Sequence, residues 1–313
     1  MEKDSSKDIF LLVDGSAIVH RAYHALPHFT SSNGEATGAV HGFFSMLFKV
    51  MQELQPTRVA IAFDRPKPTF RQQMYVGYQA QRPKMESDLS DQFKMILEIL
   101  AKAHIATYAV DGFEADDIIG TLSEEANKKG IFTYIVTGDR DMLQLVDVDT
   151  RVLMPIKGIS EVSIYDADKV REKYGINPPQ IVELKALMGD ASDNYPGVKG
   201  VGPKTASMLI NEYQTIDEIY KHIDEIASKN AKLAQKLIDG HDDCRISHKL
   251  AQIVKDVPFV FDFSDCETHN IQVHDLKDTL LTKGFKSLPQ RVDDVFGGNG
   301  TFKQDNKGQM KLL

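Results

Sequence analysis

Phe10-Leu11-Leu12-Val13-Asp14 is a short apolar run that ends in an acid. The pattern returns twice, because Asp64 follows the apolar residues 59–63 and Asp139 comes shortly after residues 134–136. Apolar runs of this length, separated by stretches with helical spacing, predict buried parallel strands. The carboxyl ends of parallel strands form the ligand crevice of an open α/β sheet. We therefore expect these acids to meet at one edge of the sheet.

Two further acidic clusters lie outside the strands and bring the number of candidate carboxylates to nine. The candidate metal ligands are Asp14, Asp64, Glu114, Asp116, Asp117, Asp139, Asp141, Asp190 and Asp193. Two unit charges about 4 Å apart repel by roughly 4 kcal/mol at an effective dielectric of 20, so converging carboxylates need protons or cations. Any one of these acids alone is more typical of a helix cap, a turn or the surface than of a metal site, but five clusters are not expected to arise by coincidence.

The ligand type points to a hard cation. Carboxylate oxygens without His or Cys suit Mg²⁺ or Mn²⁺ rather than zinc. Two such ions a few ångströms apart promote in-line hydrolysis of phosphodiesters. If the segments at 114–117 and 190–193 are helical turns, each offers two carboxylates on one face through the i, i+3 relation.

Composition sets the class of protein and of partner. The chain has 313 residues and a formal charge of −8, which argues against a nucleic-acid ligand. Setting the nine acids aside changes this charge from −8 to +1, so local basic segments decide the matter. No apolar stretch approaches a membrane span, and a cytoplasmic protein is expected. Cys244 and Cys266 have neither disulfide-framework nor zinc-site spacing.

The chain divides into two predicted domains. Up to about residue 175, strands and helices alternate, which predicts an α/β fold with a parallel sheet covered by helices. Helices are expected at 40–54, 91–102 and 115–129, and further strands at 105–110, 132–136, 151–154 and 161–165. Residues 65–90 are irregular and basic, with interleaved aromatics. From 176 to 296 we expect short helices with one strand signal at 257–261, and residues 297–313 form a polar tail expected to be flexible.

A glycine-rich stretch begins at Gly197 and runs into an expected helix. Its candidate DNA-contacting residues are Gly197, Val198, Lys199, Gly200, Val201, Gly202, Lys204 and Thr205. Pro203 interrupts the ending that a Walker motif requires, and no strand precedes it. Glycines permit a tight hairpin whose amides face a phosphate at a helix N-terminus, and the two lysines add charge. A plain connection between two helices is the alternative.

Seven stretches together resemble the 5′-nuclease family, which comprises the 5′-3′ exonuclease domain of bacterial DNA polymerase I, its free-standing bacterial relatives and flap endonucleases. They are LLVDGS (11–16), HRAYHA (20–25), AFD (62–64), TFR (69–71), GFEADDIIGTL (112–122), VTGDRDMLQLV (136–146) and LMGDASDNYPGVKGVGPKTA (187–206). They span residues 9 to about 215 in the family's order. The polar tail favours a free-standing member, although a piece of a longer polymerase would look the same.

The resemblance implies a PIN-like nuclease domain with a helical arch at about 65–100, followed by a helix-hairpin-helix (H3TH) domain. Asp14, Asp64, Glu114 and Asp116 would bind a first metal, and Asp139, Asp141, Asp190 and Asp193 a second, with Asp117 nearby. The hairpin would bind duplex phosphates and a K⁺ ion. Arg21, Tyr23, Arg82 and Lys84 are the implied catalytic residues, and Arg71, Tyr78 and Gln79 the implied DNA contacts of the arch.

The implied function is 5′-3′ exonuclease and 5′-flap endonuclease action on branched DNA or RNA primers in replication and repair, by a monomer. One residue departs from the family, which usually has Lys where this chain has Gln79. Because Gln donates only a neutral hydrogen bond to the developing charge, we expect slower cleavage, with Lys84, Arg82 or Arg21 taking part of the role. A catalytically weak DNA-binding protein and a PIN-type ribonuclease remain as alternatives.

Overall fold

A single sheet forms the centre of the computed structural model, which describes residues 8–26, 29–30, 34–83, 85–157, 161–297 and 309–310. The sheet has seven strands in the order β3-β2-β1-β4-β5-β6-β7. Their bounds are β1 Ile9–Asp14, β2 Arg58–Ala62, β3 Ala106–Tyr108, β4 Phe132–Val136, β5 Thr150–Lys157, β6 Glu161–Tyr165 and β7 Gln309–Met310. The five strands from β3 to β5 pair in parallel, and β6 and β7 are antiparallel. The predicted α/β class is confirmed.

Strand register places the predicted acids at one edge. Asp14, the last residue of β1, lies beside Ala62, the last residue of β2. Val13 lies beside Val136, so β4 ends at the same level. Both faces of β1 are buried, because Phe10 and Leu12 join one apolar cluster while Leu11 and Val13 join the other. This burial explains why the strand reads as a continuous apolar run.

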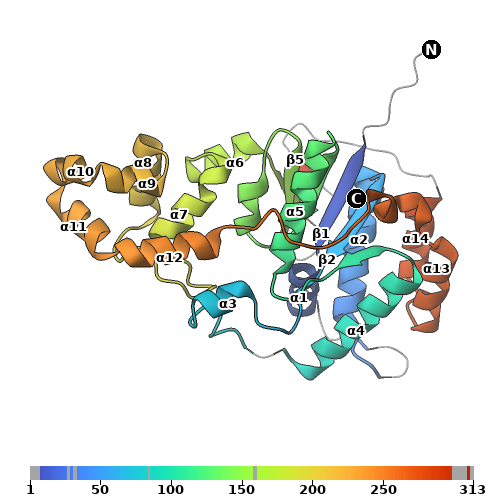
Figure 1. Cartoon of the computed structure of the whole chain (residues 1–313). Helices are drawn as coiled ribbons and strands as arrows, with labels where there is room; N and C mark the ends of the chain where they lie inside the picture. The colour runs from blue at the N-terminus through green and yellow to red at the C-terminus, as the bar shows by residue number, and fades with distance from the viewer. Residues whose placement is uncertain are drawn as a thin grey trace, which may run out of the picture.

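Helices cover both faces of the sheet (Figure 1). One face packs against α1 (Gly15–Ala25), α2 (Gly38–Leu54) and α4 (Ser87–Lys102), whose apolar residues share a cluster with Leu11 and Val13. The other face packs against α5 (Ala115–Lys128). Helix α1 was not foreseen as an element of the fold, and α4 begins four residues before its predicted start at Asp91.

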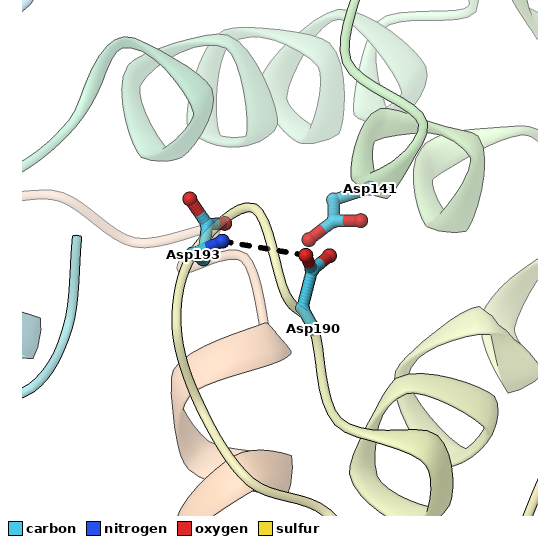
Figure 2. A group of neighbouring side chains, drawn as sticks. All are labelled: Asp141, Asp190 and Asp193. Carbon is cyan, nitrogen blue, oxygen red and sulfur yellow. Dashed lines mark hydrogen bonds between the residues drawn. The ribbon is translucent and has the colours of Figure 1, made fainter. Parts of the chain in front are cut away.

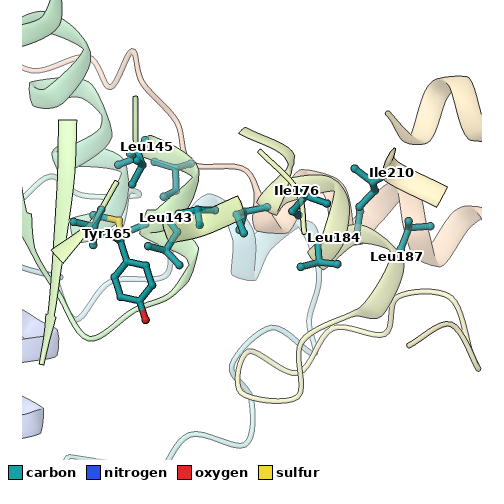
Figure 3. Packing of buried hydrophobic residues seen from close by; sticks show 14 of the residues in the cluster. Leu143, Leu145, Tyr165, Ile176, Leu184, Leu187 and Ile210 are labelled. Carbon is teal, nitrogen blue, oxygen red and sulfur yellow. The ribbon is translucent and has the colours of Figure 1, made fainter. Parts of the chain in front are cut away.

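The second part of the chain extends away from the sheet as a group of short helices (Figure 1). These are α6 Ala167–Tyr174, α7 Ile181–Met188, α8 Pro203–Tyr213, α9 Ile216–Lys221, α10 Ile223–Lys229, α11 Ala231–Asp239 and α12 His241–Ala251. The apolar core is nevertheless continuous, since Leu143 and Tyr165 belong to the same cluster as Ile176, Leu187 and Ile210 (Figure 3). This packing holds the helical part against the sheet.

The last two helices return to the sheet. Helices α13 (Val273–Thr282) and α14 (Leu288–Phe296) place Leu276, Leu280 and Leu288 in the cluster that contains α2 and α4. The packing of α13 and α14 on the sheet domain differs from the prediction, which placed both in the helical domain at 176–296. The reason is their apolar faces, which fill the outer side of α2 and α4 instead of extending the group of helices that ends with α12.

Two local predictions are wrong. Residues 257–261 form no strand; Pro258 lacks an amide hydrogen, and Phe259 and Phe261 instead pack their rings against Tyr108 of the edge strand β3. The expected strand at 105–110 is only the three residues of β3. The predicted arch contains α3 (Phe70–Met74) and α4, joined by turns and irregular backbone wherever it is described.

Other expectations concern the remainder of the chain. Most of the tail predicted to be flexible lies outside the described residues, and Gln309–Met310 within it form β7. Among the described helices, none combines the length and apolar character that crossing a bilayer would require. Cys244 and Cys266 are both buried and carry free thiols.

Candidate metal centre

The first acidic group consists of Asp14, Asp64, Glu114 and Asp116. Asp14 ends β1 and caps α1, so its Oδ1 accepts from the Ala17 amide (2.9 Å) while its Oδ2 accepts from the Thr137 hydroxyl (2.7 Å). The Asp64 Oδ1 accepts from the Ala115 amide (2.8 Å) in the first turn of α5. Backbone and hydroxyl donors therefore orient both acids at the ends of their strands.

Glu114 and Asp116 come from the start of α5. Glu114 is the N-cap of this helix, and its carboxylate accepts from Tyr78 (3.1 Å), Arg71 (3.1 Å) and Thr69 (3.3 Å). Asp116 is the second residue of the helix, in its first turn, and is half-buried. The helix N-terminus carries partial positive charge, which favours carboxylates at this point.

Burial and mutual repulsion favour protonation of three acids of the first group, Asp14, Glu114 and Asp116. Burial, followed by the charge of Asp64, raises the pKa of Asp14 to about 7. Burial likewise raises the pKa of Glu114 to about 7, although Arg71 opposes the shift. The pKa of Asp116 is raised well above its usual value by burial and then by Asp139, Asp14, Glu114 and Asp64. These mutual effects show that the four acids and Asp139 face a common space.

The second acidic group consists of Asp141, Asp190 and Asp193, whose side chains converge in Figure 2. One carboxylate oxygen from each lies within 4.8 Å of the others, and among the described residues no other set gathers this closely. Asp141 begins a 3₁₀ helix (η1, Asp141–Leu145) directly after β4 and its loop. Asp190 and Asp193 lie in a turn closed by the bridge between Asp190 and Tyr195, which replaces the helical turn we expected.

Cationic side chains contact the second acidic group. The Lys185 ammonium forms ion pairs with Asp141 Oδ1 (2.6 Å) and with Asp190 Oδ2. The Asp193 Oδ1 accepts from the Arg82 guanidinium (2.7 Å) and from the Gln79 side-chain amide (3.2 Å), so arch residues cover this acid. Burial raises the pKa of Asp141 to about 7, whereas Lys185 and Ser192 outweigh burial and lower the pKa of Asp190.

Asp139 lies between the two groups. Its Oδ1 accepts from the Asp141 amide (2.8 Å), and its own amide donates to Thr137 (2.9 Å). Its charge raises the pKa of Asp14 and Asp116 on one side and of Asp141 and Asp193 on the other. Asp139 is therefore placed to bridge both groups, a wider role than the predicted place in the second.

Asp117 and Arg71 have roles different from those predicted. The two Asp117 oxygens accept from the Arg71 guanidinium at 2.7 Å each, and also from the amides of Glu114 (3.1 Å) and Val254 (2.9 Å). Asp117 is fully buried and Arg71 is 2% exposed. The prediction of Asp117 as a metal ligand is corrected, because both oxygens are taken. Arg71 likewise cannot contact DNA in this structure; it anchors α3 to α5 and to the carbonyls of Leu250 and Gln252.

Tyr78 is also buried rather than presented for stacking on a base. Its ring stacks on that of Tyr195, with centroids 6.4 Å apart and planes 16° apart, and its hydroxyl donates to Glu114. The Tyr195 hydroxyl is buried and forms no hydrogen bond with any residue that the structure describes. This pair fastens the arch to the turn at 190–195, so the predicted stacking role of Tyr78 does not fit this arrangement.

The remaining predicted catalytic residues lie around the arch. Arg21 is half-buried on α1, and burial lowers its pKa. The Tyr23 hydroxyl donates to Glu86 (2.6 Å) and approaches Asp88, linking α1 to the start of α4. Arg82 contacts Asp193 as described, and Lys84 lies outside the described residues.

The glycine hairpin joins α7 to α8 directly after the second acidic group. Gly197 is required because its φ is +64° and a Cβ there would lie 2.0 Å from the Gly189 amide nitrogen. Val198 and Val201 are buried, so contacts they make with a ligand would use backbone atoms, whereas Lys199, Gly200, Gly202 and Lys204 are exposed. The Gly200 carbonyl, in the region expected for K⁺, accepts from the Lys236 ammonium (3.1 Å).

Sequence reasoning missed Lys185, Thr137 and Tyr195. Lys185 had a usable signal, because it interrupts an otherwise largely apolar helix five residues before Asp190. Thr137 and Tyr195 adjoin predicted acids, but nothing in the pattern distinguishes them from core residues.

The donor set fits hard divalent cations. Every candidate ligand is a carboxylate oxygen, as Mg²⁺ and Mn²⁺ prefer. The second acidic group spans at most 4.8 Å, close to the roughly 4 Å that separates opposite ligands of an octahedral magnesium ion with bonds of about 2.1 Å. In the first acidic group, burial and then the neighbouring carboxylates raise the pKa values of Asp14 and Asp116, and a bound cation would oppose this rise.

Two family models match consecutive parts of the chain. The model described as the 5′-3′ exonuclease N-terminal resolvase-like domain matches residues 9–175, and that for the 5′-3′ exonuclease C-terminal SAM fold matches 176–274. DNA polymerase I of Bacillus subtilis is 38% identical over 284 residues, which cover 91% of this chain and 32% of the relative. DNA polymerase I of Mycobacterium leprae is 40% identical over 306 residues, which cover 95% of this chain and 33% of the relative. The chain thus spans about a third of these relatives.

Solved structures share the fold at lower identity. The T5 D15 protein co-crystallised with metal ions aligns with a TM-score of 0.64 at 19% identity, covering 92% of this chain and 98% of that one. The catalytic core of Rad2 in complex with DNA substrate aligns with a TM-score of 0.58 at 18% identity, covering 94% of this chain and 93% of that one. These likenesses support the predicted sheet domain followed by a helical domain.

Proposed function

Because the chain belongs to the 5′-3′ exonuclease family, we propose that it is a divalent-metal-dependent 5′ nuclease, acting as 5′-3′ exonuclease and 5′-flap endonuclease on branched DNA and RNA primers. The observation that carries the proposal is the meeting of the two acidic groups. Carboxylates from two strand ends and from α5 face the trio Asp141, Asp190 and Asp193, with Asp139 between them. We propose that this nuclease acts in DNA replication and repair.

Asp14, Asp64, Glu114 and Asp116 would hold one Mg²⁺ or Mn²⁺, and Asp141, Asp190 and Asp193 a second, with Asp139 available to either. Bound there, the two ions would supply activation of water and stabilisation of the leaving oxygen in phosphodiester hydrolysis. The protein's contribution is to fix the ligands before the ions arrive. Asp14 and Glu114 show this most clearly, since each is held by at least two hydrogen bonds.

The cationic residues around the acids would receive the phosphate. Arg82 on the arch and Gln79 both contact Asp193, and Arg21, half-buried on α1, would supply a further cation. Asp193 takes up only one guanidinium nitrogen of Arg82, and the side chain is 53% exposed, so its other N–H donors would be available to a phosphate. Gln79 then donates a neutral hydrogen bond where a lysine would add charge.

The glycine hairpin would hold the duplex beside the cut. Exposed Lys199 and Lys204 and the amides at the start of α8 favour backbone phosphates, and the hairpin carbonyls favour a K⁺ ion. We extend the proposal to 5′-flap and RNA–DNA junctions as substrates, to action as a monomer and to a cytoplasmic location. The nuclease unit would comprise residues up to about 175 together with α13 and α14, and the DNA-binding unit the helices α7 to α12.

A three-substrate cleavage assay tests the proposal. The protein is offered a 5′-labelled flap duplex, a blunt duplex and single-stranded RNA, each with Mg²⁺ and with EDTA. We expect metal-dependent cleavage of the flap above the other two substrates. Flap binding without cleavage would favour the catalytically weak DNA-binding alternative, and preferred cleavage of the RNA would favour the ribonuclease.

A further inference from the structure

Lys185 is the cation most deeply set into the second acidic group. Its ammonium contacts both Asp141 and Asp190, while its side chain is only 22% exposed. The two acids come from segments far apart in sequence, and their carboxylates point toward one another in Figure 2. Like charges this close repel strongly in a partly buried site, so the ammonium between them holds the pair together.

The other cation of this group is attached differently. Arg82 contacts Asp193 from the arch, and its side chain is 53% exposed. Lys185 instead projects from α7, whose residues Leu184, Ala186 and Leu187 are buried in the main apolar cluster. Arg82 can therefore leave with the arch, but Lys185 stays beside the acids in every arrangement that keeps α7 packed.

We propose that Lys185 is a resident cation of the second acidic group, which preassembles Asp141 and Asp190 before metal binds and lowers the affinity of the group for its divalent ion. The inference rests on the proposed function, since it takes this group as a metal site. Once Arg82 has left with the arch, the three carboxylates offer a net charge of −2 with Lys185 present rather than −3. A divalent ion must share or displace the ammonium, so its binding is weaker than the ligand set alone would give.

Because Lys185 weakens binding at the second acidic group, the ion bound there should dissociate more readily than the ion at the first group. The first acidic group contains no lysine ion pair among the described residues, and its nearest cation, Arg71, is bound to Asp117 as well as to Glu114. We therefore expect the two groups to fill in order, with the first group binding more tightly. Lys185 acts here as a positioning residue rather than as a catalytic one.

The test is a titration of metal-free protein with Mn²⁺ alone, following free Mn²⁺ by electron paramagnetic resonance. Wild type is compared with Lys185→Met, with Lys185→Arg and with Lys94→Met, which removes an exposed lysine paired with Asp91. We expect the weaker site of Lys185→Met to bind at least about tenfold more tightly, because a neighbouring like charge is gone. The tighter site should not change, and the Arg and Lys94 variants should resemble wild type.

Thermal unfolding in EDTA supplies a second readout. Lys185→Met should have a lower Tm than wild type, since two carboxylates lose their counterion, and excess Mn²⁺ should restore it. Lys185→Gln is measured in parallel, so that a poorly folded Met variant does not end the experiment. The Gln variant should show the same tighter second site.

An unchanged or weaker second site in the neutral variants would overturn the proposal, as would a single Mn²⁺ bound by wild type and variants alike. One Mn²⁺ in wild type and two in Lys185→Met would support it strongly. The function is judged separately: a protein that binds two Mn²⁺ but does not cleave the flap contradicts the nuclease proposal and leaves the role of Lys185 standing.

Discussion

The two acidic groups use the same chemical ligands but are assembled differently. The first is built on the ends of β1 and β2 and the start of α5, and backbone amides and hydroxyls orient its acids. The second joins η1 to a turn beyond α7, and Lys185 and Arg82 hold its acids. The sheet edge holds its like charges with one flanking cation, Arg71 on Glu114, because its strands are fixed by pairing and packing. Segments that meet only in the tertiary fold need counterions to stay together.

The largest effect expected from this difference is on cleavage. Asp116→Asn should lower flap cleavage by more than about a hundredfold, since even loss of an outer-shell partner costs 10–100-fold in metal sites. Asp193→Asn should cost less and should recover in part with excess Mn²⁺, because this acid already shares its oxygen with Arg82. Single-turnover rates check both, with Asp111→Asn on the surface as control. Equal, unrecoverable losses would show that the two groups contribute alike.

The next effect is on stability and concerns the buried ion pair between Arg71 and Asp117, which lies behind the first acidic group. Arg71→Met leaves Asp117 buried without its cation and should reduce the free energy of unfolding by about 3–5 kcal/mol, as when other buried ion pairs are broken. The control is Arg65→Met, whose partner Asp111 is 41% exposed, and for which about 0–1 kcal/mol is expected. Urea denaturation in EDTA measures both. A loss for Arg71→Met no larger than the control would mean that Arg71 is not the anchor we describe.

A smaller effect is the pH dependence of the metal-free protein. The folded-state pKa values of Asp14 and Glu114 are raised to about 7, above their unfolded values, so the stability linked to these protons is lost as pH rises through 7. In EDTA, Tm should therefore fall between pH 6 and 8, and excess Mg²⁺ should reduce the fall. Asp190→Asn should leave this slope in place, because the pKa of Asp190 is lowered. A flat profile in EDTA would contradict the assigned environment of the first group.

The smallest effect is expected at the arch. Gln79→Lys places a cation beside Asp193 and near the path of the phosphate, at a residue whose φ of +54° a lysine adopts no less readily than glutamine. Single-turnover flap cleavage at saturating Mg²⁺ should rise by about two- to tenfold, because a cation stabilises transition-state charge better than an amide. Gln81→Lys, on the exposed side of the same turn, is the matched control. An unchanged rate would indicate that Arg82 or Arg21 already supplies this charge.

The pattern of apolar runs and acids along the chain predicted the ligands of the first acidic group better than the roles of the residues around them. The acids at Asp14 and Asp64 could be placed because apolar runs identify strands, and parallel strands end at a common edge. The roles of Asp117, Arg71 and Tyr78 could not be read in the same way. Asp117 lies in the same cluster as Asp116, and only the burial of Arg71 against it distinguishes a structural acid from a candidate ligand.

The sequence by itself determined the α/β class, the positions of most helices and strands, and the set of acids among which the candidate ligands lie. These follow from local periodicity and from the fixed geometry of strand ends. Only the tertiary structure decided that Lys185 sits between Asp141 and Asp190, that the arch docks on Asp193, and that α13 and α14 return to the sheet. Those contacts join residues from 5 to more than 200 positions apart, and long-range packing rather than local pattern selects them.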